Sequence, residues 1–190
     1  MPLHCTLGGY ESSIKLSIYN TFRTLRLNQF DTPMPVLGIT DPYEWLRSLR
    51  LDWRVMEPAW SGSTQGGGSF VMINTQALSM PQLRRHGDAR IGWGIEDLVA
   101  MFMHEARHTV PGGGKMHSCP RLPQVNQQAV DPSLSSGGAY AVGYWFQMWC
   151  ANHTTSSLYT ESQREYLRRL AGAWRGPGGR FCDEFAATRA

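Results

Sequence analysis

Apolar residues recur at helical spacing near the start of the chain. Ile14, Ile18, Phe22 and Leu25 follow one another at intervals of four, four and three residues. This spacing places the four side chains on one face of a helix. The pattern therefore predicts an amphipathic helix over residues 13–27.

A start signal marks a second, shorter helix. Asp41 suits an N-cap, Pro42 the first helical position and Glu44 the last position of a capping box. We expect this helix to end near Arg50. The short apolar run 36–39 that precedes it predicts a strand.

Two further segments are typical of strands. Residues 51–55 read Leu, Asp, Trp, Arg and Val, which alternates apolar with polar side chains. Residues 69–74 (Ser-Phe-Val-Met-Ile-Asn) predict a second strand. The segment 58–68 between them is rich in Gly and Ser and predicts a loop. We therefore expect the two strands to pair antiparallel across this loop.

The second half of the chain predicts three helices. The first begins near residue 94 or 95 and runs to about residue 109, where Pro111 and three glycines end it. The second covers 133–152 and is apolar on most sides, so we expect it to be central. The third begins at the capping-box sequence Thr160-Glu161-Ser162-Gln163. Together these elements predict an α+β fold in a single domain over 1–190, in which a small sheet packs with several helices.

Composition and charge narrow the class of protein. The chain has 190 residues, of which 42% are hydrophobic and 17% charged, which suits a globular domain with a sizeable core. The net charge of +3 is scattered, so no nucleic-acid partner is expected. The most apolar run, 139–151, is shorter than the roughly twenty residues that a membrane span needs. The N-terminus lacks a signal-peptide pattern, so we expect a cytoplasmic protein or a secreted one without a recognisable signal.

The four cysteines, Cys5, Cys119, Cys150 and Cys182, are far apart and form no CxxC pair. This spacing excludes a zinc finger or zinc ribbon. It leaves either buried thiols or two disulfides, and we favour thiols.

The segment that carries chemistry is His104-Glu105-Ala106-Arg107-His108. On a helix, positions i and i+4 lie one turn apart on the same face, so His104 and His108 can point their imidazoles at one metal ion. Glu105 projects from a neighbouring angle, close enough to take a proton from a metal-bound water. This is the HExxH pattern.

The chain resembles the zincin superfamily of zinc metallopeptidases. The resemblance is carried by His104-Glu105-x-x-His108 and by the order strand, zinc helix, turn and second helix, over about residues 69–152. It implies a zincin-like fold, with zinc as the cofactor and His104 and His108 as ligands. It also implies that Glu105 is the general base and that the substrate is a peptide or protein.

A catalytic zinc has three protein ligands, and the third is open between two residues. His117 lies nine residues after His108, beyond the glycine turn 112–114, a longer spacing than the HExxHxxGxxH of the metzincins. Asp131 is the rival, because the aspzincins use an aspartate downstream of the motif, and it also suits a helix cap. We favour His117 as the ligand and Asp131 as a partner that orients a ligand imidazole.

Tyr140 and Tyr144 lie on the helix expected to cross behind the metal. Both suit core packing, and Tyr140 is also a candidate for donating a hydrogen bond to the oxyanion of a tetrahedral intermediate. Arg107 suits a helix-surface role or a grip on a substrate carboxylate. The sequence therefore predicts a zinc metallopeptidase in which Glu105 activates a zinc-bound water. The alternative is a non-catalytic zinc-binding interaction domain.

Overall fold

A computed structural model of the protein describes residues 5–6, 12–56, 70–75, 78, 95–110, 130–155, 157–175 and 179–182. These residues combine helices with a small sheet, which confirms the α+β class. In chain order the elements are β1 (Cys5–Thr6), α1 (Ser12–Leu27), α2 (Pro42–Ser48), β2 (Asp52–Met56), β3 (Phe70–Asn74), α4 (Ile95–Thr109), α5 (Ala139–Asn152) and α6 (Glu161–Ala173).

The sheet is parallel, so the predicted antiparallel pair is wrong. The strand order is β1-β2-β3, and both pairs run parallel, with Trp53 of β2 opposite Val71 of β3. The alternation within a strand fixes which side chains face the core, but it does not fix the strand's direction. Direction depends on the connection, and a parallel pair needs a crossover of about a dozen residues or more. The 57–69 connection is long enough for one, although its composition suggests a simple loop.

Local start signals predict the helices well. Asp41 caps α2 by accepting a hydrogen bond from the backbone N–H of Glu44 at 2.9 Å, as expected. The Glu44 side chain bonds to Arg47 instead of completing a capping box. Thr160 and Gln163 form the predicted reciprocal capping box at the start of α6. The caps confirm the helix starts because they depend only on residues three positions apart.

Residues 36–39 form a turn, so the predicted strand there is wrong. The backbone N–H of Gly38 donates to the Met34 carbonyl at 2.8 Å, and Met34 pairs with Ile39 in an isolated antiparallel bridge. Both Val36 (φ 74°) and Gly38 (φ 65°) have left-handed backbones. The turn-forming Pro35 and Gly38 therefore outweigh the apolar run as local signals.

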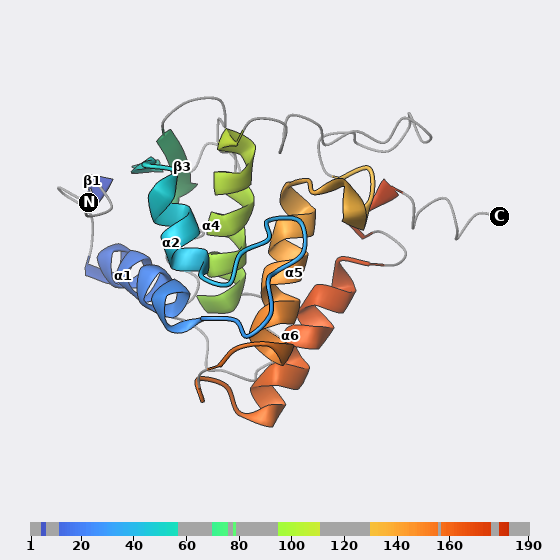
Figure 1. Ribbon diagram of the computed structural model, residues 1–190. Coiled ribbons are helices and arrows are strands. Elements are labelled where there is room, and N and C mark those ends of the chain that lie inside the picture. The colour runs from blue at the N-terminus through green and yellow to red at the C-terminus, as the bar shows by residue number, and fades with distance from the viewer. Residues whose placement is uncertain are drawn as a thin grey trace.

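The predicted helix over 133–152 is interrupted. A short 3-10 turn, Leu134–Ser136, is followed by Gly137 with a φ of 71°, and α5 begins only at Ala139. Two adjacent glycines break the helix because one of them adopts the left-handed conformation. The expectation that this helix is central is confirmed, since most of α5 is buried and it packs between α4 and α6 (Figure 1).

An aromatic cluster joins the sheet to the helices. The Trp53 ring of β2 stacks on the Phe102 ring of α4, with 4.6 Å between centroids and 12° between planes. Phe22 of α1 meets both rings edge-on, at 5.8 and 5.7 Å. Trp53 and Phe102 are almost fully buried. Two other elements, α1 and β2, thus pack on α4, which carries the HExxH segment.

The cysteines differ from the expected set of thiols. Cys150 is a reduced thiol buried in α5, as expected, but Cys182 is disulfide-bonded. The side chains of Cys5 and Cys119 lie outside the described part of the chain. Among the described helices, none is both long and apolar enough to cross a membrane.

Candidate metal centre

Helix α4 brings His104 and His108 together one turn apart. Their Nε2 atoms are 3.2 Å from each other, and the two rings meet edge to face with 4.9 Å between centroids. Two metal–nitrogen bonds of about 2.0–2.1 Å at a tetrahedral angle would hold the nitrogens about 3.3 Å apart. The separation therefore fits two imidazoles that share one tetrahedral metal ion.

Glu105 completes a cluster with the two histidines. One ligand atom from each of the three residues lies within 4.8 Å of the others. Glu105 is only 5% exposed, and its Oε2 is buried with no hydrogen-bond partner among the described residues. Burial raises the pKa of this carboxyl group to about 8. A buried carboxylate oxygen without a partner, next to two imidazole nitrogens, suits a site built for a cation or a polar ligand.

The cluster lies inside the protein rather than on an open helix face. The side of α4 that carries Leu98, Phe102 and Ala106 is buried as expected. His104 and Glu105 are buried as well, because α5 packs along α4 (Figure 1). His108 is half-buried and lies nearer the surface. Among the three, His108 is thus the most exposed.

Tyr140 is the residue of α5 that lies against the cluster. Its ring meets the His104 ring at 4.5 Å between centroids and 67° between planes. Trp174 packs on another edge of the tyrosine at 5.8 Å, and the guanidinium carbon of Arg180 lies 5.1 Å from its ring centroid. Burial is the main cause that raises the pKa of Tyr140. The structure therefore brings Tyr140 next to His104.

Asp131 contacts the first turn of helix α5. It is 1% exposed, and its Oδ2 accepts a hydrogen bond from the backbone N–H of Ala141 at 2.9 Å. A Cβ on Gly138 would lie only 2.3 Å from this carboxylate, so the close approach requires glycine there. Asp131 is not part of the cluster of ligand atoms formed by the described residues. Asp131 thus satisfies an N–H in the first turn of α5, whose N-cap is Gly138, instead of capping a helix that begins beside it, and its role as third ligand or imidazole partner stays a prediction.

His117 and Arg107 complete the account of the predicted residues. His117 lies in 111–129, outside the described residues, so its role as third ligand stays a prediction. Arg107 is half-buried, and its Nε donates to the carbonyl of Gly137 at 2.8 Å. This bond ties α4 to the turn before α5. Burial lowers the pKa of Arg107, and the charge of Asp131 acts in the opposite direction.

Arg180 is a residue at this site that the sequence alone does not point to. It is separated from the motif by about seventy residues and belongs to no recognisable pattern. Its place depends on a tertiary contact: Asp131 and Phe181 form a parallel bridge that brings residues 179–182 beside the start of α5. Periodicity and motif spacing carry no signal for such a contact.

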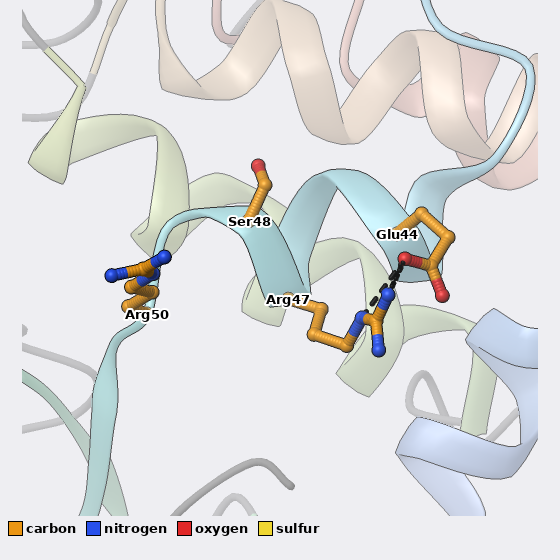
Figure 2. A pocket seen from close by; sticks show the side chains of 4 residues that line it. All are labelled: Glu44, Arg47, Ser48 and Arg50. Carbon is orange, nitrogen blue, oxygen red and sulfur yellow. Dashed lines mark hydrogen bonds and ion pairs between the residues drawn. The ribbon is translucent and has the colours of Figure 1, made fainter. Parts of the chain in front are cut away.

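A surface hollow on α2 has a different character. It is lined by Glu44, Arg47, Ser48 and Arg50 (Figure 2). Figure 2 shows Arg47 turned toward Glu44, with which it forms an ion pair between two exposed side chains. Exposed pairs of this kind contribute little to stability. The HExxH cluster, which is buried, is the better candidate for chemistry.

Comparison of the chain with protein-family models, with curated proteins and with solved structures gives no match. The functional argument for this protein is therefore built on its own residues.

Proposed function

We propose that the protein is a zinc-dependent hydrolase, a metallopeptidase of the HExxH type with a zincin-like fold. The observation that carries the proposal is the pair of imidazole nitrogens 3.2 Å apart beside the buried Glu105 carboxyl group. His104, His108 and, as the predicted third ligand, His117 would hold the ion. When bound there, zinc would polarise the substrate carbonyl and lower the pKa of water.

Glu105 is the proposed general base. Its carboxyl group lies within 4.8 Å of the imidazole nitrogens, so it can reach a water molecule held beside them. Burial raises the pKa of this carboxyl group to about 8 in the metal-free protein, and a cation bound beside it would favour the carboxylate form that a base needs. Glu105 would take the proton from water and pass it to the leaving amine.

Tyr140 and β3 are the proposed elements of substrate binding. Three ring contacts hold Tyr140 beside His104, which supports its hydroxyl as a donor to the oxyanion that forms on the peptide carbonyl. β3 is one of the two outer strands of the described sheet, and an outer strand can pair with an extended peptide. The Tyr140→Phe variant tests the first role, because it keeps the ring and removes the hydroxyl.

We also propose that the protein works in an oxidising compartment. The disulfide at Cys182 supports the secreted alternative over the cytoplasmic one, because disulfides persist mainly in secreted proteins.

Metal content is the first test. We expect purified wild type to contain about one zinc per chain by mass spectrometry, and His108→Ala and His117→Ala to lose it. Asp131→Ala should keep it. Loss of zinc in Asp131→Ala with retention in His117→Ala would make the aspartate the third ligand. A wild type that takes up no zinc would contradict the proposal.

Hydrolysis is the second test. Zinc-loaded wild type is incubated with a mixture of peptides, and new termini are detected by mass spectrometry. Glu105→Gln, loaded to the same zinc content, is the control that removes the base and keeps the ligands. Cleavage by wild type alone supports the metallopeptidase. Full zinc content without cleavage of any peptide would favour the non-catalytic zinc-binding domain.

A further inference from the structure

An exposed arginine lies beside the proposed metal centre. The guanidinium carbon of Arg180 is 5.1 Å from the centroid of the Tyr140 ring, and that ring lies 4.5 Å from the ring of His104. The cation is therefore at most about 10 Å from His104, a distance equal to about three residues of extended chain. The Arg180 residue itself is exposed to solvent.

The backbone that carries Arg180 is held firmly. Its N–H donates to the Trp174 carbonyl at 2.7 Å, and its own carbonyl accepts from the Asp131 N–H at 2.8 Å. The next residue, Phe181, is buried, and Cys182 is disulfide-bonded. An exposed cation on so constrained a segment is positioned in advance, which lowers the entropy cost of binding an anion.

The other described cation near the cluster, Arg107, is less exposed. Arg107 is half-buried, and its Nε is engaged with the Gly137 carbonyl. Two acids are described near the cluster, Glu105 and Asp131, and both are buried. Asp131 accepts a hydrogen bond from the first turn of α5. Of these two described cations, Arg180 is therefore the one that is exposed to solvent.

We infer that Arg180 binds the C-terminal carboxylate of a peptide substrate, one or two residues beyond the bond that is cut. This inference rests on the proposed function. A guanidinium group suits the task because it can donate two parallel hydrogen bonds to one carboxylate. The centre would thus release amino acids or short fragments from the C-terminal ends of peptides.

Kinetics on matched substrates test the inference. Arg180→Gln should lower kcat/KM at least tenfold more for a peptide with a free C-terminus than for the same peptide amidated. The additional loss should appear mainly in KM, because any loss that comes from the Tyr140 ring contact is common to both substrates. Arg180→Lys should recover part of the loss. Arg169→Gln is the control, because Arg169 is also exposed and lies 5.9 Å from the centroid of a tyrosine ring, that of Tyr166 on α6. Equal losses for acid and amide, or no loss, would overturn the inference.

Binding without turnover provides a second readout that does not depend on hydrolysis. Zinc-loaded Glu105→Gln is titrated calorimetrically with acetyl-alanyl-alanine and with its amide. Tighter binding of the acid, lost when Arg180→Gln is added, supports the inference even if no peptide is cleaved. A preference for the acid that survives Arg180→Gln would overturn it. Equally tight binding of an amidated peptide that ends in aspartate would overturn the assignment to the chain terminus.

Discussion

The second half of α4 and the segment before α5 each bury a carboxyl group. The two groups differ in their hydrogen bonding. Asp131 is 1% exposed, and its Oδ2 accepts a hydrogen bond from Ala141 at 2.9 Å. Glu105 is 5% exposed, and its buried Oε2 has no such partner within the described chain. The first carboxylate holds a helix in place. The second is left available.

The difference distinguishes a structural acid, Asp131, from the proposed general base, Glu105. A buried polar atom without a partner costs about 1–3 kcal/mol, so proteins seldom keep one without a purpose. Burial alone therefore does not identify a functional carboxylate. The contrast between a satisfied and an unsatisfied carboxylate oxygen, next to two imidazole nitrogens, is what supports the proposal that Glu105 exchanges protons.

The largest expected effect concerns hydrolysis. Glu105→Gln should lower kcat/KM of the zinc-loaded protein by about 10²–10⁴-fold, the usual contribution of a general base. The zinc content should not change, because the imidazole ligands stay in place. Glu161→Gln, which changes an exposed glutamate on α6, serves as the control. A Glu105→Gln variant as active as wild type would show that Glu105 is not the general base.

A second prediction concerns pH and the metal-free protein. The pKa of Glu105 is raised from 4.5 to about 8 in the folded state. The folded protein therefore binds the proton of this carboxyl group more tightly than the unfolded chain does. Its contribution to stability is therefore complete below pH 4.5 and is lost as pH rises toward 8. The loss amounts to a few kcal/mol, since one pKa unit corresponds to about 1.4 kcal/mol.

Urea unfolding with the metal removed by a chelator measures this loss. Glu105→Gln should flatten the decline of stability between pH 5 and pH 8 and be the more stable protein at pH 8. Subtracting the two curves cancels the titration of groups that both proteins share. Parallel curves would mean that Glu105 is satisfied in the folded state after all.

A third, smaller effect concerns Asp131. Asp131→Ala should lower the free energy of unfolding by about 2 kcal/mol, because it leaves the Ala141 N–H, in the first turn of α5, buried without an acceptor. Asp131→Asn, which keeps an oxygen at the same place, should lose less. Urea unfolding of both variants measures the difference. Loss of bound zinc from folded Asp131→Ala would show that this acid, too, belongs to the metal centre.

The smallest effect concerns an exposed acid. Glu161 on α6 bonds to Arg168 at 2.8 Å, and its side chain is 76% exposed. This hydrogen bond lowers the pKa of Glu161, but solvent screens the interaction. Glu161→Gln should therefore leave the urea midpoint at neutral pH unchanged. A clear shift of the midpoint would mean that an exposed ion pair contributes to the stability of this fold.

The features that could be predicted from the sequence depend on near neighbours. The Asp41 and Thr160 caps, the amphipathic spacing of α1 and the pairing of His104 with His108 all follow from residues three or four positions apart. The local helix geometry alone determines how such residues lie relative to each other. The same reasoning locates the cluster but says nothing of what covers it.

The features that could not be predicted depend on distant parts of the chain. The parallel direction of β2 and β3 depends on their connection, and the partner of Asp131 lies ten residues ahead on α5. Arg180 reaches Tyr140 only because its segment pairs with Asp131. Sequence patterns describe one element at a time, and these contacts arise between elements.

The pairing of Asp131 with residues 180–182 also affects when the candidate metal centre can form during synthesis. A chain leaves the ribosome from its N-terminus, at about 5–20 residues per second. The HExxH segment therefore emerges well before Phe181, whose bridge to Asp131 steadies the start of α5. A nascent chain that already carries the motif still lacks the surroundings of Tyr140. The order of synthesis thus keeps the candidate centre unfinished until residues 180–182 have emerged.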